Sequence, residues 1–220
     1  MEFKHCGHVV TTKEAAPVAC SMSLAVEALR HLVRDVLAFP ERHEWSIQGF
    51  GMLRTYLTPD VRLHVWDPEY RVEHVSDIHD HPWHFESLIV SGSIENRRFR
   101  VVEGEPTHSR GRIVCGPKPA THGAQDVTHV RLEQWCEGVF HVGDSYRMQA
   151  DELHASIPSR GAVSIIRRTK AEKDPDRAVV YWPFGEEWVS AEPRPATLGI
   201  VRRITRRALE CWSKKGEAEG

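Results

Sequence analysis

Short β-type segments, separated by turn residues, dominate residues 50–170 and constrain the fold more than any other feature. Val61, Leu63 and Val65 alternate with other residues in the period-two pattern of a strand with one buried face. About eight such strands with little helix between them favour a sandwich or barrel over a parallel α/β sheet. The expected strands are 52–57, 61–66, 87–91, 94–102, 127–132, 138–142, 146–150 and 163–169.

Amphipathic helices are expected on both sides of this strand-rich region. Residues 23–39 repeat apolar side chains at three- and four-residue steps, and Pro40 ends the pattern. Residues 196–212 have an apolar side and a basic side, the latter formed by Arg202, Arg203, Arg206 and Arg207. Because a charged run on a helix is usually a solvated face, nucleic-acid binding by these arginines is the minority interpretation.

The expected organisation is an N-terminal helical segment over residues 1–45, a β-barrel over 46–190 and a C-terminal helical tail over 191–220. Residues 109–127 are rich in Gly, Pro and His and are expected to form a long loop or ragged hairpin. Residues 170–177 are charged and expected to be exposed. The aromatic residues at 182–188 are expected to cover one end of the barrel.

Composition excludes several classes of function. The net charge of −2 gives no overall basic character that would indicate a nucleic-acid partner. The sequence contains no run of about 18 apolar residues, so no membrane span is expected. The N-terminus lacks the apolar stretch of a signal peptide. The five cysteines form no CxxC pair, which favours a reducing compartment. We therefore expect a cytoplasmic protein with no membrane partner. Unpaired strands at an open barrel end would also favour a possible homodimer through sheet edges.

Histidine is abundant, with 14 residues, and two segments give some of them the spacing of metal ligands. In the first segment, His79 and His81 are two residues apart, so on a strand they point to one face. Glu86 follows after Pro82, which suits a turn that would bring the carboxylate back to the pair. Imidazole and carboxylate ligands together suit divalent first-row metals.

The second segment begins with Gly143, continues as a strand and reaches His154. Taken with the first segment, it resembles the two motifs of the cupin superfamily, over roughly residues 75–168. The first motif is matched by His79, His81, Glu86 and Gly92, one residue short of the usual spacing. The second is degenerate: Gly143 and His154 are correctly separated, but Gln149, Asp151 and Pro158 stand where the family has proline, glycine and asparagine.

This resemblance implies a mainly β double-stranded β-helix, the cupin or jelly-roll barrel, with a helix before and after it. It also implies a divalent metal ion, with Fe(II) favoured and Mn, Ni or Zn as alternatives, bound by His79, His81, Glu86 and His154. Some cupins bind metal through three histidines alone, so Glu86 decides between a four-ligand and a three-histidine centre. Among cupin enzymes, our first expectation is a ferrous dioxygenase or hydroxylase. The alternatives are a non-oxidative isomerase or lyase and a cupin that binds a small ligand without turnover.

Residues near the two motifs are candidates for the substrate pocket. An inward arginine on these strands would bind a carboxylate or phosphate through its planar fork. Arg98 and Tyr146 are the leading candidates, and a small anionic molecule is accordingly the expected substrate. The other candidates are Arg97, Arg100 and Arg147 for the anion, with Trp83, Phe85, Phe99 and Met148 for an apolar wall that is equally well explained as ordinary core.

Overall fold

A computed structural model describes residues 16–114, 123–169 and 177–216, and the fold is mainly β, with 53% strand. The helices are α1 (Ala16–Ala38), the short 3-10 helix η1 (Pro40–Arg42) and α2 (Leu198–Gly216). The strands are β1 (Ser46–Gln48), β2 (Phe50–Tyr56), β3 (Val61–Arg71), β4 (Ile78–His79), β5 (His84–Ser91), β6 (Ser93–Val102), β7 (His108–Val114), β8 (Gln125–His141), β9 (Ser145–Met148), β10 (Leu153–Pro158), β11 (Val163–Thr169), β12 (Arg177–Pro183) and β13 (Arg194–Pro195).

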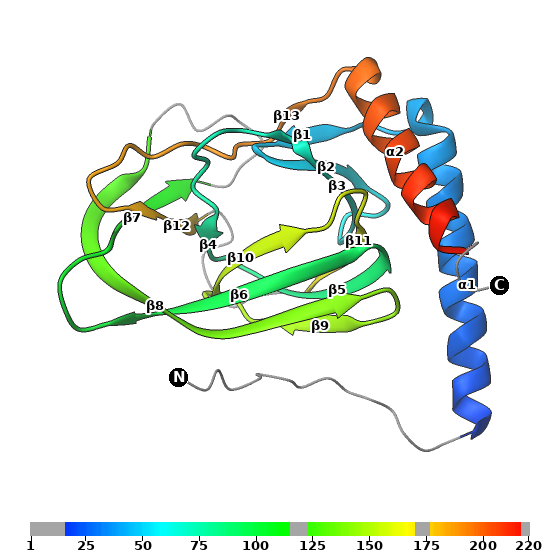
Figure 1. The fold of residues 1–220 in the computed structure, drawn as a ribbon, viewed down its shortest axis with the longest axis horizontal. Helices are drawn as coiled ribbons and strands as arrows, with labels where there is room; N and C mark the ends of the chain where they lie inside the picture. Colours follow the sequence, from blue (N-terminus) through cyan, green and yellow to red (C-terminus); the bar gives the residue numbers. More distant parts are fainter. Residues whose placement is uncertain (1–15, 115–122, 170–176, 217–220) are drawn as a thin grey trace.

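The strands form two antiparallel sheets, an arrangement consistent with a β-sandwich (Figure 1). The first sheet has seven strands in the order β13-β1-β2-β3-β11-β5-β9. The second runs β10-β4-β12-β7-β8-β6, and β6 pairs again with β10, so this sheet closes on itself. Strands far apart in the sequence are therefore neighbours, which brings β4 and β10 together.

The outer face of the seven-stranded sheet packs against the two long helices. Figure 1 shows α1 and α2 together on one side of the strands. Leu63 and Ile165 from the sheet join Val36 and Leu37 of α1 and Ile204 of α2 in one buried apolar cluster. The period-two pattern of the strands and the helical repeat of the flanking segments thus meet at the same interface.

The opposite face of this sheet points between the two sheets. Met52 of β2, Trp66 of β3 and Ile166 of β11 are buried there with Phe85 of β5. These residues alternate in sequence with the ones that face the helices, so each strand contributes to two separate cores. The region between the two sheets also contains a cavity, which Met52, Trp66, Phe85 and Ile166 line.

Several elements differ from the sequence-based expectations. Residues 109–127 contain β7 and the start of β8, which pair antiparallel with one register shift, so of the two expected alternatives the ragged hairpin is confirmed and the long loop is not; residues 115–122 lie outside the described part of the chain. Two expected strands, 127–132 and 138–142, are parts of the single strand β8. Of the intervening residues 133–137, only Cys136 is buried, yet they continue the pairing with β6 with one register shift. Most of the charged stretch 170–177 also lies outside the described residues.

Candidate metal centre

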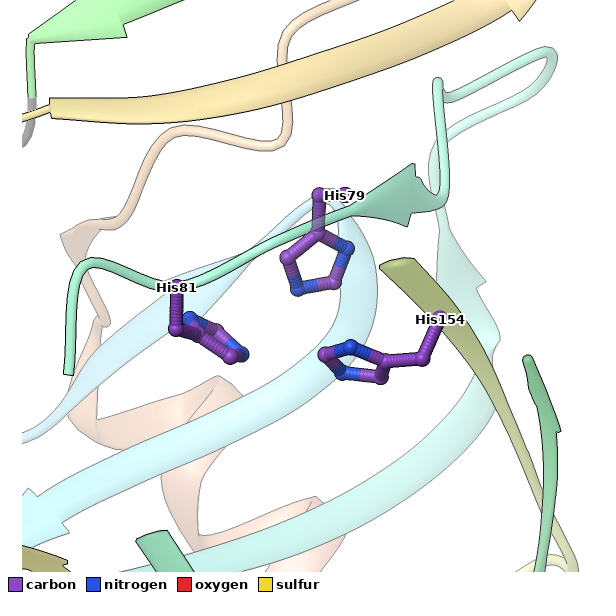
Figure 2. A group of neighbouring side chains, drawn as sticks. All are labelled: His79, His81 and His154. Carbon is purple, nitrogen blue, oxygen red and sulfur yellow. The ribbon is translucent and has the colours of Figure 1, made fainter. Parts of the chain in front are cut away.

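Three histidines converge at the point where β4 and β10 pair. His79 ends β4, and its registered partner on β10 is His154. His81 follows β4 two residues later, and Figure 2 shows the three rings turned toward one another. The ring centres are 4.8 Å apart for His79 and His81, 4.7 Å for His79 and His154, and 5.1 Å for His81 and His154. One nitrogen from each ring lies within 4.8 Å of the other two.

Backbone carbonyl groups orient two of these rings. His79 Nδ1 lies 2.8 Å from the Asp77 carbonyl oxygen, and His154 Nδ1 lies 3.3 Å from that of Glu152. Because a carbonyl group only accepts, Nδ1 carries the proton and donates it in both contacts. The remaining nitrogen, Nε2, therefore has a free lone pair. A hydrogen bond of this kind, which fixes the tautomer, is typical of histidines that ligate a metal.

The surroundings also hold the rings in the neutral form that binds metal. Burial lowers the pKa of His154 to about 3, helped by the charge of neighbouring His79. Burial likewise lowers the pKa of His79, against the opposing effect of its hydrogen bond to Asp77. The pKa of His81 lies well below its usual value because of burial and then the charges of His79 and His154. Three neutral imidazoles facing one point fit a divalent first-row metal ion.

Glu86, the fourth expected ligand, does not join the three histidines. It is a neighbour of Phe85 on β5, and successive side chains of a strand point to opposite faces. Phe85 faces His81, with ring centres 5.3 Å apart, whereas Glu86 pairs across the strands with Arg167 of β11 and Arg147 of β9. Its carboxylate oxygens lie 2.5 Å from Arg167 and 2.6 Å from Arg147. Burial acts to raise the pKa of Glu86, but these two arginines together lower it.

The three histidines open onto a cavity of about 680 Å³ between the sheets. A volume in this range accommodates a small organic molecule. The histidines share the cavity wall with aromatic and apolar side chains and with three arginines. The main lining residues are Phe50, Met52, Arg54, Tyr56, Arg62, His64, Trp66, Trp83, Phe85, Tyr146, Ser164, Ile166 and Arg168.

Some of the residues predicted from the sequence to form the pocket line the cavity, and others do not. Tyr146 lines the cavity and is buried, which raises the pKa of its phenol. Trp83 and Phe85 also line it, whereas Phe99 packs in a separate apolar cluster and Met148 is buried in the core between the sheets. Arg98 lies near His154 but forms an ion pair with Glu152, at 2.5 Å, and is not part of the cavity lining.

The other candidate arginines are paired with carboxylates as well. Arg97 pairs with Glu95, Arg100 with Glu133 and Arg147 with Glu86. The arginines that line the cavity are instead Arg54, Arg62 and Arg168, which sequence reasoning missed. The available signal was the alternation of residues 61–66. The apolar residues of that strand were correctly assigned to a core, but the opposite face, with Arg62 and His64, faces the cavity instead of solvent.

Comparison of the sequence with models of known protein families and with curated proteins finds no match. The functional interpretation therefore depends on the geometry and chemistry of the site.

Proposed function

We propose that this protein is a metal-dependent enzyme of the cupin type, and that it is an Fe(II) oxygenase acting on a small anionic molecule. The observation that carries the proposal is the convergence of His79, His81 and His154, neutral and oriented, at the wall of a cavity. A fold that only bound a ligand would have no need to bring three imidazoles to one point. Imidazole ligands suit iron among the divalent first-row metals, and three of them leave coordination positions open for a substrate and O₂.

Two glycines support the cupin resemblance. Gly92 joins β5 to β6 with a φ of +71°, and Gly143 lies between β8 and β9 with a φ of +89°. Both values fall in the left-handed region that favours glycine. At Gly92 a side chain would also lie 2.8 Å from the Ala162 Cα atom. The glycine positions of both cupin motifs therefore have a structural requirement for glycine in this chain, as expected for a double-stranded β-helix.

In the proposed enzyme, the three histidines hold the ion, and the cavity wall positions the substrate beside it. When bound, the ferrous ion would supply redox chemistry with O₂. Trp83 stacks on His81 with ring centres 4.4 Å apart, and Phe85 lies edge-on to the same ring. These aromatic side chains limit the access of water to His81. Asp77 and Glu152, through their backbone carbonyls, keep the Nε2 atoms of His79 and His154 facing the cavity.

The oxygenase assignment is tested by loading the purified protein with Fe(II) under anaerobic conditions and adding O₂ with a panel of small carboxylates. We expect O₂ uptake with at least one carboxylate in the wild-type protein, and none above background in His81→Ala. Glu86→Gln is a matched control, since it alters the same sequence motif outside the three-histidine group. Iron-loaded protein that consumes no O₂ with any member of the panel would contradict the oxygenase assignment and favour a non-oxidative reaction or ligand binding.

A further inference from the structure

Arg62 is a buried cation in the cavity wall. Only 8% of its surface is exposed, and among the described residues no carboxylate lies within ion-pairing distance of it. Its guanidinium carbon lies 4.8 Å from the centre of the Tyr56 ring and 5.1 Å from that of Trp83. Aromatic faces attract a cation but do not neutralise its charge. A guanidinium buried in this way is costly unless an anion joins it.

Two more arginines surround the same aromatic residue. The guanidinium carbons of Arg54 and Arg168 lie 5.6 and 5.8 Å from the centre of the Tyr56 ring. Arg168 lies 3.9 Å from the exposed carboxylate of Asp60 and donates to a backbone carbonyl, so its charge is partly shared. Burial, together with the charges of Arg54 and Arg168, lowers the pKa of Arg62 to about 10, against the opposing effect of Tyr56. The cluster therefore carries positive charge that no described carboxylate balances at Arg62.

Polar atoms around Arg62 also lack hydrogen-bond partners. Arg62 Nε, His64 Nε2 and Ser164 Oγ are buried, line the cavity and have no partner among the described residues. His64 is two residues from Arg62 on β3, and Ser164 is its registered neighbour on β11. Buried polar atoms are rarely left unsatisfied in folded proteins. Several of them on one face of the neighbouring strands β3 and β11 indicate a surface built to receive a polar group of a ligand.

Trp83 connects this cluster to the three histidines. The Trp83 ring contacts the guanidinium group of Arg62 and also stacks on the ring of His81. The guanidinium carbon of Arg62 is therefore no farther from the His81 ring than these two contact distances combined, 5.1 and 4.4 Å. A molecule of a few carbon atoms can extend from one group to the other.

We propose that Arg62, flanked by Arg168, binds the carboxylate group of the substrate and directs the rest of the molecule toward His79, His81 and His154. That the end of the substrate away from its carboxylate is the end that reacts depends on the proposed metal function. A carboxylate is favoured over a phosphate because one guanidinium lacks a carboxylate partner and because its planar fork matches a planar monoanion. The apolar walls at Met52, Trp66 and Ile166 suit a hydrocarbon body.

The test is an NMR titration of the full-length protein with straight-chain monocarboxylates from acetate to hexanoate, each compared with its uncharged primary amide and with inorganic phosphate. The titrations are made after treatment with a chelator, so that the carboxylate cannot bind a metal ion. We expect the carboxylates to bind and the amides to bind at least tenfold more weakly. Tighter binding of phosphate than of every carboxylate would overturn the carboxylate assignment, and so would equal affinity for acids and amides.

Three variants locate the binding group. Arg62→Met should weaken carboxylate binding by about 10- to 100-fold, the range of charge-assisted hydrogen bonds. Arg62→Lys, which keeps the charge but loses the fork, should show an intermediate affinity. Arg167→Met is the matched control, because Arg167 lies on β11 next to Arg168 but pairs with Glu86 on the opposite face. Wild-type affinity in Arg62→Met, with an unchanged thermal unfolding midpoint, would refute the proposal.

The same titrations separate this proposal from the proposed metal function. His81→Ala should lose metal yet bind the carboxylate as the chelator-treated wild-type protein does, because the anion contacts Arg62. If the wild-type protein holds no metal, the enzyme proposal fails while the carboxylate result still stands. If the wild-type protein binds metal and Arg62→Met leaves the carboxylate affinity unchanged, the carboxylate proposal fails while the metal site still stands.

Discussion

At the scale of single residues, the face of the strand on which a residue lies decides its role. Phe85 and Glu86 are adjacent in sequence, yet one packs on His81 and the other pairs with Arg147 and Arg167. Glu86 therefore contributes to the surface of the sheet. The exposed fraction of its side chain is 28%, and those of its two partners are larger, so solvent screens these ion pairs.

We expect Glu86→Gln to retain its metal and to lose less than about 1 kcal/mol of unfolding free energy, the usual range for ion pairs exposed to solvent. The measurements are metal content after gel filtration and unfolding in urea. Loss of metal from this variant would instead identify Glu86 as a ligand.

His64 is a buried histidine beside Arg62, and burial, followed by the charges of Arg62 and Arg54, lowers its pKa well below the usual value. The unfolded chain takes up a proton at His64 as the pH falls through about 6.5, whereas the folded protein does not. This residue therefore reduces the stability of the fold as the pH falls from about 6.5 toward its folded pKa.

We expect His64→Met to flatten the pH dependence of stability below pH 6.5, by up to about 1.4 kcal/mol per pH unit. Urea unfolding of chelator-treated wild-type and variant proteins at pH 7 and pH 5 measures the difference. Parallel losses of stability in the two proteins would show that His64 is protonated in the folded state.

Residue patterns alone could reach only part of the site. The spacing of His79 and His81 indicated a shared direction, and the separation of Gly143 and His154 indicated a matching strand; the structure brings these three histidines together. The role of Glu86 depends on cross-strand neighbours that a linear pattern does not contain. Arg62 was missed for a related reason. Both faces of β3 are buried, but its alternation of apolar and polar residues is also typical of a strand whose polar face is exposed to solvent.

At the scale of elements, α2 is an amphipathic helix whose apolar side closes the outer face of the seven-stranded sheet. Three of the four arginines on its basic side form ion pairs: Arg207 lies 2.9 Å from Asp67, Arg206 lies 3.7 Å from Glu210 and Arg202 lies 4.0 Å from Glu41. The side chains of Arg202 and Arg206 are exposed, whereas Arg207 contacts the buried carboxylate of Asp67 and so fastens the helix to β3. Neither of the two long helices in the described part of the chain is long and apolar enough to cross a membrane.

We expect Ile204→Ala to lower the unfolding free energy by about 2–4 kcal/mol, because it removes a fully packed side chain between α2 and the sheet. Leu198→Ala in the same helix is the control, since that side chain is 43% exposed, and a loss below about 0.5 kcal/mol is expected there. Equal losses in the two variants, measured by urea unfolding, would argue against the packing of α2 on the sheet.

The regular elements with a clear apolar pattern were predicted correctly. Residues 61–66 alternate regularly and lie in β3. Residues 163–169 begin with the apolar residues Val163, Ile165 and Ile166 and lie in β11, and the two flanking helices follow their apolar repeats. β8 was divided into two predicted strands because residues 133–137 lack apolar alternation. β12 was not predicted, because the residues around its end, 182–188, were interpreted as an aromatic cluster over one end of the barrel.

At the scale of the whole molecule, the helices occupy the outer face of one sheet and leave the space between the sheets for the cavity. The cavity has the three histidines in one part of its lining and the arginine cluster in another, with Trp83 in contact with both. We propose that this arrangement binds a metal ion and an anionic group at the same time. Its central element is the three-histidine group, on which the proposed chemistry depends.

Metal content tests that element most directly. The wild-type protein and the His81→Ala, His154→Ala and Glu86→Gln variants are loaded with Fe(II) under anaerobic conditions, separated from free metal and analysed for iron. We expect about one ion per chain in the wild-type protein and in Glu86→Gln, and loss of most of the metal in both histidine variants. Iron that remains at the wild-type level when either histidine is replaced would contradict the three-histidine centre.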